Sequence, residues 1–245
     1  MKFKVNTIFK PKEINVFFKF RIDSNRDIII FLLEHHPASD DFFLDRLFPW
    51  TLEDLHSMRF YNNQQSKTTW CFSQFLQRHA LSAAMGCQLA ELRILKGKYG
   101  KPFLENSPLT FNLSHCSGCS ALAVSRNRSL GIDIEDSKSI SKDGLLLVSR
   151  NFSQSENRWI NNGTCEKQIR LRSLSVFTQK EALLKALDIG LTTHLDSIKT
   201  SLADPPFITD SNFSFCFGEN DDFVGSLSSG DLTSLGIEVR YFYYC

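Results

Sequence analysis

The spacing of apolar residues along this 245-residue chain changes from stretch to stretch and predicts both strands and helices. Asp27–Leu33 is almost entirely apolar after its first residue, which predicts a buried strand. From Ser66 to about Leu95, apolar residues recur every three or four positions and predict a helix with one apolar stripe. The residues of that stripe are Phe72, Phe75, Leu76, Ala80 and Ala83.

A loop and three short strands are predicted after this helix. The sequence Gly-Lys-Tyr-Gly-Lys-Pro at Gly97–Pro102 is typical of a loop. Leu109–Leu113 has the composition of a strand. Cys119–Ser125 and Leu130–Glu135 are also strand-like, and the polar residues Arg126–Ser129 between them predict a hairpin.

The remainder of the chain is predicted to contain helices and then strands. One helix opens at Ser153, and a second runs from about Thr178 to Leu187. Strand-like runs follow at Phe213–Phe217 and Ile237–Tyr243. This order of elements favours an α+β fold of two halves, with the break near Arg126.

Composition and charge exclude some classes of function. Apolar residues make up 42% and charged residues 22%, as in ordinary globular proteins. A net charge of +1 provides no overall field for nucleic acid or anionic lipid. The longest apolar run, Ile28–Leu33, is too short to span a membrane, and the N-terminus lacks a signal-peptide core. Seven irregularly spaced cysteines favour a reducing cytoplasm over a disulfide framework.

Two carboxylates alternate with isoleucines in Gly131–Glu135. In a strand, Ile132 and Ile134 point to one face, and Asp133 and Glu135 point to the other. Adjacent carboxylates repel each other unless a cation or water separates them, and carboxylate oxygens are ligands that Mg²⁺ prefers. The pair therefore indicates either a magnesium site or the solvated face of a half-buried strand.

Glu181 and Lys185 are four residues apart and share one face of the second predicted helix. They indicate a site for a metal-bound phosphate or an ordinary surface ion pair. Glu181 also stands three residues after Thr178, which is the spacing of a capping box at a helix start. Ser153 and Glu156 have the same spacing and the same ambiguity.

The other candidate motifs are weaker evidence for a catalytic or metal-binding function. Ser114 and His115 are neighbours in a predicted strand, so their side chains face opposite ways and are poorly placed as nucleophile and base. Cys116 and Cys119 form a C-x-x-C without a second ligand pair, and a strand rather than a helix is predicted after them. The sequence contains no glycine-rich dinucleotide motif and no P-loop.

The order of these motifs resembles that of the 4′-phosphopantetheinyl transferase superfamily. The matching blocks are Gly100–Pro102, Phe111–His115, Gly131–Glu135, Phe152–Glu156 and Lys180–Lys185. The length is similar to that of the larger, surfactin-type branch. This resemblance implies a monomer of two similar α/β halves related by pseudo-twofold symmetry. Residues 1–126 would contact coenzyme A and the carrier protein, and residues 127–245 would hold the magnesium site.

The resemblance also implies roles for individual residues. It implies Mg²⁺ ligands at Asp133, Glu135 and Glu181, and coenzyme A contacts at Lys101, Ser114, His115 and Lys185. The implied catalytic residues are Glu181, Lys185 and Glu156, which would lie near the metal. The sequence departs from the family where Phe177 replaces a usual tryptophan. An expected arginine after Arg59-Phe60 is also missing, which leaves Lys67 as a substitute contact for the 3′-phosphate.

The implied reaction is Mg²⁺-dependent transfer of phosphopantetheine from coenzyme A to a serine of an apo acyl or peptidyl carrier protein. Adenosine 3′,5′-bisphosphate would leave. Two alternatives remain open at this point: a non-catalytic relative that binds carrier proteins, and a metal or redox protein built on Cys116 and Cys119.

Overall fold

The computed structural model describes residues 4–6, 22, 27–35, 50–189, 194–218 and 221–244. The strands are β1 (Lys4–Asn6), β2 (Asp27–His35), β3 (Ile94–Lys96), β4 (Pro102–Leu104), β5 (Leu109–Cys116), β6 (Cys119–Arg126), β7 (Gly131–Asp136), β8 (Phe207–Ile208), β9 (Asn212–Phe217), β10 (Phe223–Ser228) and β11 (Gly236–Tyr244). The helices are α3 (Leu52–Met58), α4 (Gln64–Met85), α5 (Lys142–Ser149), α6 (Gln154–Asn161) and α7 (Glu166–Leu187). Short 3₁₀ turns lie at Leu89–Glu91, Leu195–Ser197 and Leu232–Ser234.

The strands form two larger sheets and one small one. The first sheet has the order β1-β11-β2-β6-β5, in which β11 runs parallel to both of its neighbours and the other pairs are antiparallel. The second sheet is antiparallel throughout, with the order β7-β10-β9-β8. β3 and β4 pair only with each other. The fold is therefore α+β.

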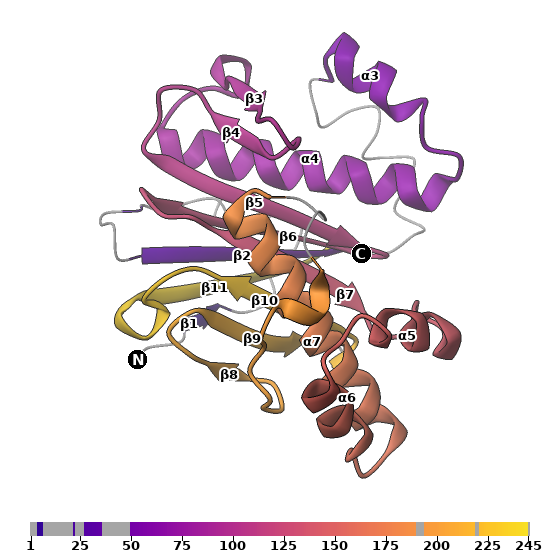
Figure 1. Cartoon of the computed structure of the whole chain (residues 1–245). Helices are drawn as coiled ribbons and strands as arrows, with labels where there is room; N and C mark the ends of the chain where they lie inside the picture. Colours follow the sequence, from indigo (N-terminus) through magenta and orange to yellow (C-terminus); the bar gives the residue numbers. More distant parts are fainter. Residues whose placement is uncertain are drawn as a thin grey trace.

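The two larger sheets pack on each other, and α4 covers the outer face of the first (Figure 1). Strand β2 shows why its sequence is continuously apolar. Ile29 and Phe31 face the core beneath α4, whereas Ile28 and Ile30 face the core between the sheets. Both faces of β2 are buried, so alternation with polar residues disappears.

Helix α7 packs on the second sheet through small hydroxyl side chains. Thr178 Oγ1 lies 2.8 Å from Ser226 Oγ, which lies 2.8 Å from Ser214 Oγ, which in turn lies 3.0 Å from Ser175 Oγ. All four side chains are buried. Because each hydroxyl can both donate and accept, the row satisfies itself and fixes how α7 lies on β9 and β10.

Most predicted elements are confirmed, with corrected ends. The helix predicted to reach Leu95 ends at Met85, because Gly86 adopts a left-handed conformation with φ of 67° and terminates it. The helix predicted to begin near Thr178 begins at Glu166. The polar and charged residues of its first turns concealed the apolar spacing there.

The predicted hairpin between Cys119–Ser125 and Leu130–Glu135 is wrong. Both segments are strands, but β6 pairs with β5 and β2, whereas β7 pairs with β10 in the other sheet. The hairpin is instead β5–β6, closed by Ser117 and Gly118, with Gly118 at a positive φ of 79°. The polar segment after β6 carries the chain from one sheet to the other.

The predicted boundary after residue 126 does not separate the sheets. Strand β11 belongs to residues 127–245 but lies between β1 and β2 in the first sheet. The division into two domains stays a prediction. Within the described ranges, none of the helices combines the length and the apolar character that crossing a bilayer requires.

Candidate functional site

Glycine at position 131 lets α7 approach β7 very closely. A Cβ atom built on Gly131 would lie 1.8 Å from the carbonyl oxygen of Ala182 and 2.5 Å from the amide nitrogen of Ala186. Any side chain here would push the helix away from the strand. Gly131, Asp133 and Glu135 share one face of β7. The close approach therefore places Asp133 opposite the turn of α7 that carries Glu181 and Lys185.

Asp133 lies at the centre of a buried polar cluster. Its Oδ1 accepts hydrogen bonds from Lys185 Nζ at 2.6 Å and from Ser114 Oγ at 2.9 Å. Lys185 Nζ also donates to Ser114 Oγ at 3.0 Å and to the carbonyl of Ile132 at 3.2 Å. Asp133 is only 5% exposed, so these contacts fix its carboxylate in place. Three predicted site residues, from three separate segments, meet here.

The second oxygen of Asp133, Oδ2, is buried and has no hydrogen-bond partner. A charged oxygen in this state is costly unless a ligand completes it. Burial, followed by repulsion from Asp133, raises the pKa of Glu135 to about 7. The same two causes raise the pKa of Glu181 above its ordinary value, against the opposing effect of Lys185. Negative charge is thus concentrated here beyond what Lys185 neutralises.

The acidic cluster has the chemistry of a hard-cation site. Carboxylate oxygens suit a divalent cation such as Mg²⁺, and the unpartnered Oδ2 of Asp133 is a free ligand position. Among the described residues, no three His, Cys, Asp or Glu side chains are grouped closely enough to hold a metal as they stand. Asp133 alone is therefore fixed as a potential ligand, and the ligand roles of Glu135 and Glu181 stay predictions.

A cavity of about 300 Å³ opens beside this cluster and is lined by both basic and acidic residues. Lys101, Glu181 and Lys185 all line it. Lys101 Nζ donates to the carbonyls of Leu130 at 2.9 Å and Lys185 at 2.5 Å, so it also binds the C-terminal end of α7. Cations are favourable at that end of a helix. Lys101 thus reaches the predicted location but already uses two of its donors.

His115 lines a different cavity, as strand alternation predicts for the neighbour of Ser114. This second cavity of about 470 Å³ lies between the end of β5 and the start of α4. Partial desolvation, and then the Lys185 ammonium, lower the pKa of His115, so the imidazole is neutral near pH 7. Thr69, whose buried hydroxyl has no partner, lines the same cavity. Lys67 lies on the neighbouring turn of α4 but is not among the lining residues.

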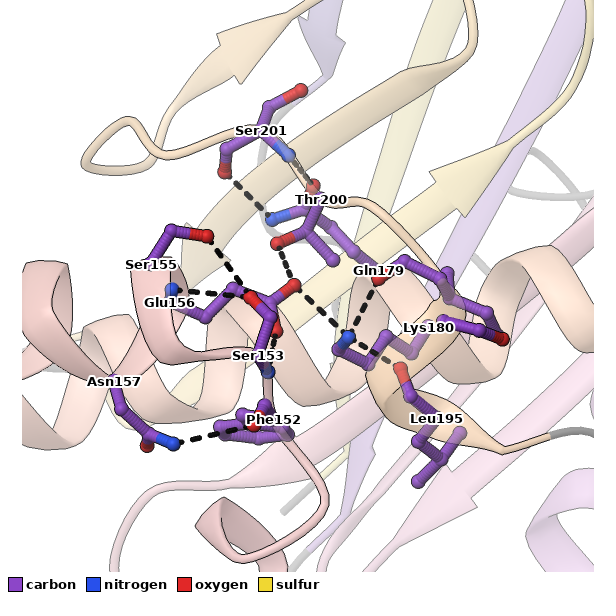
Figure 2. Close-up of polar contacts among 12 residues, drawn as sticks. Phe152, Ser153, Ser155, Glu156, Asn157, Gln179, Lys180, Leu195, Thr200 and Ser201 are labelled. Atoms are coloured by element: carbon purple, nitrogen blue, oxygen red, sulfur yellow. Dashed lines mark hydrogen bonds and ion pairs between the residues drawn. The ribbon is translucent and has the colours of Figure 1, made fainter.

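Glu156 belongs to a separate buried network rather than to the acidic cluster (Figure 2). Its carboxylate accepts from the amide of Ser153 at 2.7 Å and from Thr200 Oγ1 at 2.7 Å, and it pairs with Lys180 Nζ at 2.9 Å. Ser153 and Glu156 form a capping box at the start of α6, so that alternative is confirmed. In the described part of the chain, these contacts of the Glu156 carboxylate link α6 to its neighbouring segments, and none of them is with the acidic cluster.

The capping-box alternative for Thr178 and Glu181 is wrong. Thr178 lies in the interior of α7, twelve residues after the first residue Glu166, and its hydroxyl bonds Ser226 and the carbonyl of Ser175. The backbone amide of Glu181 is therefore an ordinary interior helix amide. The side chain of Glu181 is not needed as a cap and remains available to the cavity.

Cys116 and Cys119 face each other across the β5–β6 hairpin as free cysteines. Burial raises the pKa of both thiols well above the usual value, which disfavours the reactive and metal-binding thiolate. Neither cysteine stands at a helix start, and no metal-binding group of three side chains includes them in the described ranges. These findings count against the metal or redox alternative.

Sequence reasoning missed several residues that shape the site. Gly131, at the second position of the predicted strand Leu130–Glu135, carried a recognisable signal, because glycine in a strand often marks close approach of another backbone. Thr69 and the row of hydroxyls beneath α7 gave no such signal. Their significance depends on which elements pack together, and local spacing does not reveal that.

Comparison with known proteins agrees with the order of the motifs. The model of the 4′-phosphopantetheinyl transferase superfamily matches residues 129–223, which include β7, α6 and α7. Similar curated proteins are the L-aminoadipate-semialdehyde dehydrogenase-phosphopantetheinyl transferase of Candida glabrata, 26% identical over 62% of this chain, and the 4′-phosphopantetheinyl transferase Sfp of Bacillus subtilis, 29% identical over 59%. Another 4′-phosphopantetheinyl transferase of Bacillus subtilis is 29% identical over 60%. The matched part spans 59–63% of the length of these relatives. The matched segment and the ordered motifs therefore make the chain similar to the 4′-phosphopantetheinyl transferase superfamily over residues 129–223, and to the transferases of Bacillus subtilis over about 60% of its length.

Proposed function

We propose that this protein transfers the 4′-phosphopantetheine arm of coenzyme A to a serine of an apo acyl or peptidyl carrier protein. The serine oxygen forms a bond to the phosphorus that bears the pantetheine arm. The bond from that phosphorus to the bridging oxygen breaks, and adenosine 3′,5′-bisphosphate leaves. The serine proton passes to a base, so atoms and charge balance.

The observation that carries this proposal is the environment of Asp133. One carboxylate oxygen is fixed by Lys185 and Ser114, while the other is buried and without a partner, close to two further carboxylates and a cavity. Acidic and basic groups beside one cavity suit a ligand that joins a cation to a diphosphate. The arrangement would be costly in a protein that bound neither.

Asp133, Glu135 and Glu181 are the proposed holders of Mg²⁺. The free Oδ2 of Asp133 supplies one ligand position. Burial first, and then repulsion from Asp133, raise the pKa of Glu135 to about 7, and a bound cation would favour its charged form again. When bound, Mg²⁺ would neutralise the diphosphate and make its phosphorus more susceptible to attack. We expect Glu135 and Glu181 to turn towards Asp133 when they ligate.

The basic residues act on the substrate phosphates. Lys185 lines the cavity and is held in place by Asp133 and Ser114, so its ammonium is preorganised to offset charge on the leaving group. Lys101 lines the same cavity. His115, with Lys67 on the neighbouring helix, is proposed to meet the 3′-phosphate in the second cavity.

Glu181 is the proposed acceptor of the serine proton. Its raised pKa brings it closer to neutral pH than an ordinary carboxylate, which favours general-base action. Glu156 was predicted as a catalytic residue, and we propose a different role for it. Its contacts with Ser153, Thr200 and Lys180 support α6 and α7, which carry the site.

The proposal is tested by incubating the protein with coenzyme A, Mg²⁺ and apo carrier proteins of fatty-acid, polyketide and nonribosomal-peptide type. The expected result is a mass gain of one phosphopantetheine on at least one carrier, which disappears when its acceptor serine is changed to alanine. A non-catalytic relative would bind a carrier and leave its mass unchanged.

We further propose that the protein works as a cytoplasmic monomer of two similar halves, residues 1–126 and 127–245. Support comes from the site itself, because Lys101 and Ser114 from the first half meet Asp133 and Lys185 from the second within one chain. Sedimentation at assay concentration is expected to give the mass of one chain. An obligate trimer would contradict this.

A further inference from the structure

We infer that Thr178 keeps one ligand position of Asp133 open, because it holds the hydroxyl group of Ser226 away from the carboxylate. Thr178 is thus a positioning residue that acts through Ser226 and Asp133. The inference rests on the proposed function for the occupant of that position, which is a divalent cation. Sequence reasoning considered Thr178 only as a helix cap and assigned no role to Ser226.

The pairing of β7 with β10 places Ser226 beside Asp133. The two residues lie directly opposite each other in this antiparallel pair, so their side chains leave the same face of the sheet. That face is covered by α7, since Ser226 contacts Thr178 there. The Cβ atoms of such a pair are about 4.5–5.5 Å apart, which allows a hydroxyl to donate to a carboxylate. Ser226 is therefore a nearby donor for the Asp133 carboxylate.

Ser226 nevertheless does not donate to Asp133. Asp133 Oδ1 has two other donors, and Oδ2 is buried without a partner. Ser226 Oγ lies instead 2.8 Å from Thr178 Oγ1 and 2.8 Å from Ser214 Oγ. A charged oxygen is a stronger acceptor of a hydroxyl proton than a neutral hydroxyl is. The contacts of Ser226 with its two neighbours therefore have to keep its hydroxyl turned away from Oδ2.

Thr178 provides this restraint through the direction of its own proton. Its hydroxyl donates to the carbonyl of Ser175 at 3.3 Å, one turn earlier in α7. Thr178 Oγ1 can then serve Ser226 only as an acceptor, so the proton of Ser226 is used in that bond. The close approach at Gly131 holds α7, and with it Thr178, against the sheet. The Ser226 proton is thus kept from Asp133 Oδ2.

An open Oδ2 matters because a hydroxyl proton and a cation compete for the same oxygen. A hydrogen bond from Ser226 to Asp133 Oδ2 would have to break before a cation could be bound there. Hydrogen bonds to charged groups are strong enough that this competition should weaken cation binding about tenfold. Thr178 therefore raises the affinity of the site for a metal without touching the metal.

The experiment measures Mn²⁺ binding to the full chain with coenzyme A present and no carrier protein, by electron paramagnetic resonance of the free ion. Binding to coenzyme A alone is subtracted. Thr178→Val has nearly the shape of threonine but lacks the hydroxyl, so it releases the proton of Ser226 towards Asp133. We expect the Kd for Mn²⁺ to rise about tenfold. Thr178→Ser keeps the hydroxyl and should bind within about twofold of wild type.

A double variant separates this role from a purely structural one. Thr178→Val combined with Ser226→Ala lacks the released hydroxyl, so the Kd should return to within about threefold of wild type. If Thr178 only stabilised the packing of α7, the second substitution would remove a further buried contact and weaken binding more.

Ser175→Ala is the matched control, because it removes a buried hydroxyl at the other end of the same row. It leaves the carbonyl that Thr178 uses in place. It should lower the melting temperature and change the Kd for Mn²⁺ less than about twofold.

The inference is overturned if Thr178→Val folds and binds Mn²⁺ within threefold of wild type, or if the double variant binds as weakly as Thr178→Val. If Thr178→Val does not fold, the rotamer of Ser226 in labelled wild-type protein decides, measured from three-bond couplings. A hydroxyl directed at Thr178 before and after Mg²⁺ is added supports the inference, and one directed at Asp133 before addition refutes it. Wild-type protein that binds no Mn²⁺ would instead overturn the metal role in the proposed function.

Discussion

At the residue scale, the role of Glu181 depends on its charge. It lies in the interior of α7 and lines the cavity beside Asp133, so its side chain is not required to start the helix. Glu181→Gln should fold with a free energy of unfolding within about 1 kcal/mol of wild type, as for a non-disruptive substitution. The transfer rate should fall at least about 100-fold, because glutamine provides neither a charged ligand nor a base.

Glu166→Gln is the matched control for this substitution. Glu166 occupies the first turn of the same helix, away from Asp133, and its neutralisation should leave the transfer rate within about twofold, since first-turn charge effects are worth well under 1 kcal/mol. Single-turnover kinetics measure the transfer rate of both variants, and urea unfolding measures their free energy of unfolding. Wild-type turnover by Glu181→Gln would show that Glu181 is neither a ligand nor a base.

His35 gives a prediction about pH. Its side chain is buried, stacks on Phe72 with ring centroids 4.3 Å apart, and has no hydrogen bond at either ring nitrogen. Burial, with a smaller effect of His115, lowers the pKa of His35 to about 4. The unfolded chain binds a proton near pH 6.5, so the native state loses stability as pH falls from about 6.5 to about 4.

His35→Phe should remove this acid-dependent loss of stability. For a pKa lowered from 6.5 to about 4, the loss amounts to about 3 kcal/mol at most. The variant should be at least as stable as wild type at pH 8, because two unpartnered buried nitrogens are removed. Its advantage should grow towards pH 5. Melting temperatures measured from pH 8 to pH 5 test this, and parallel curves for the two proteins would contradict the assignment of a neutral buried imidazole.

At the scale of elements, Lys180 joins three segments of the chain (Figure 2). Its ammonium pairs with Glu156 on α6 and donates to the carbonyls of Leu195 at 2.6 Å and Ile198 at 2.7 Å, beyond the end of α7. The pair is almost fully buried, with side-chain exposures of 0% and 3%. Removing one partner leaves an uncompensated charge in the interior.

Lys180→Met should therefore lower the free energy of unfolding by about 3–5 kcal/mol. Adding Glu156→Gln to that variant should recover part of the loss, because the unpaired carboxylate is then gone. Lys167→Met is the control on the same helix: its ion pair with Asp221 is exposed, and its loss should cost less than about 1 kcal/mol. Urea titrations measure all of these. A cost below 1 kcal/mol for Lys180→Met would show that the pair does not join these segments.

The sequence predicts the elements of this fold better than their partners. The run of apolar residues in β2 predicts a strand with two buried faces, because local spacing reports burial directly. Spacing does not report which strands pair, so the link from β6 to β7 was mistaken for a hairpin when it is a crossing between sheets. The insertion of β11 between β1 and β2 depends on contacts more than 200 positions apart and leaves no local pattern.

At the scale of the whole molecule, the site assembles from segments that are far apart in the chain. The order of motifs predicted Ser114, Asp133 and Lys185, and the structure places these three in mutual contact. Glu156, by contrast, forms a capping box and pairs with Lys180 instead of joining these three residues. The sequence alone could not decide this, because a glutamate with capping-box spacing fits either environment. Residues such as Ser226 acquire meaning only once β7 and β10 are known to be paired.

The central claim is that this acidic and basic cavity transfers phosphopantetheine with the help of a divalent cation. The most direct measurement follows one reaction of apo carrier, coenzyme A and protein by mass spectrometry, first with excess chelator and then after Mg²⁺ is restored. The account predicts no transfer in chelator and, once Mg²⁺ is restored, one adenosine 3′,5′-bisphosphate released for each carrier modified. Transfer that continues undiminished in chelator, or bisphosphate released without a modified carrier, would contradict it.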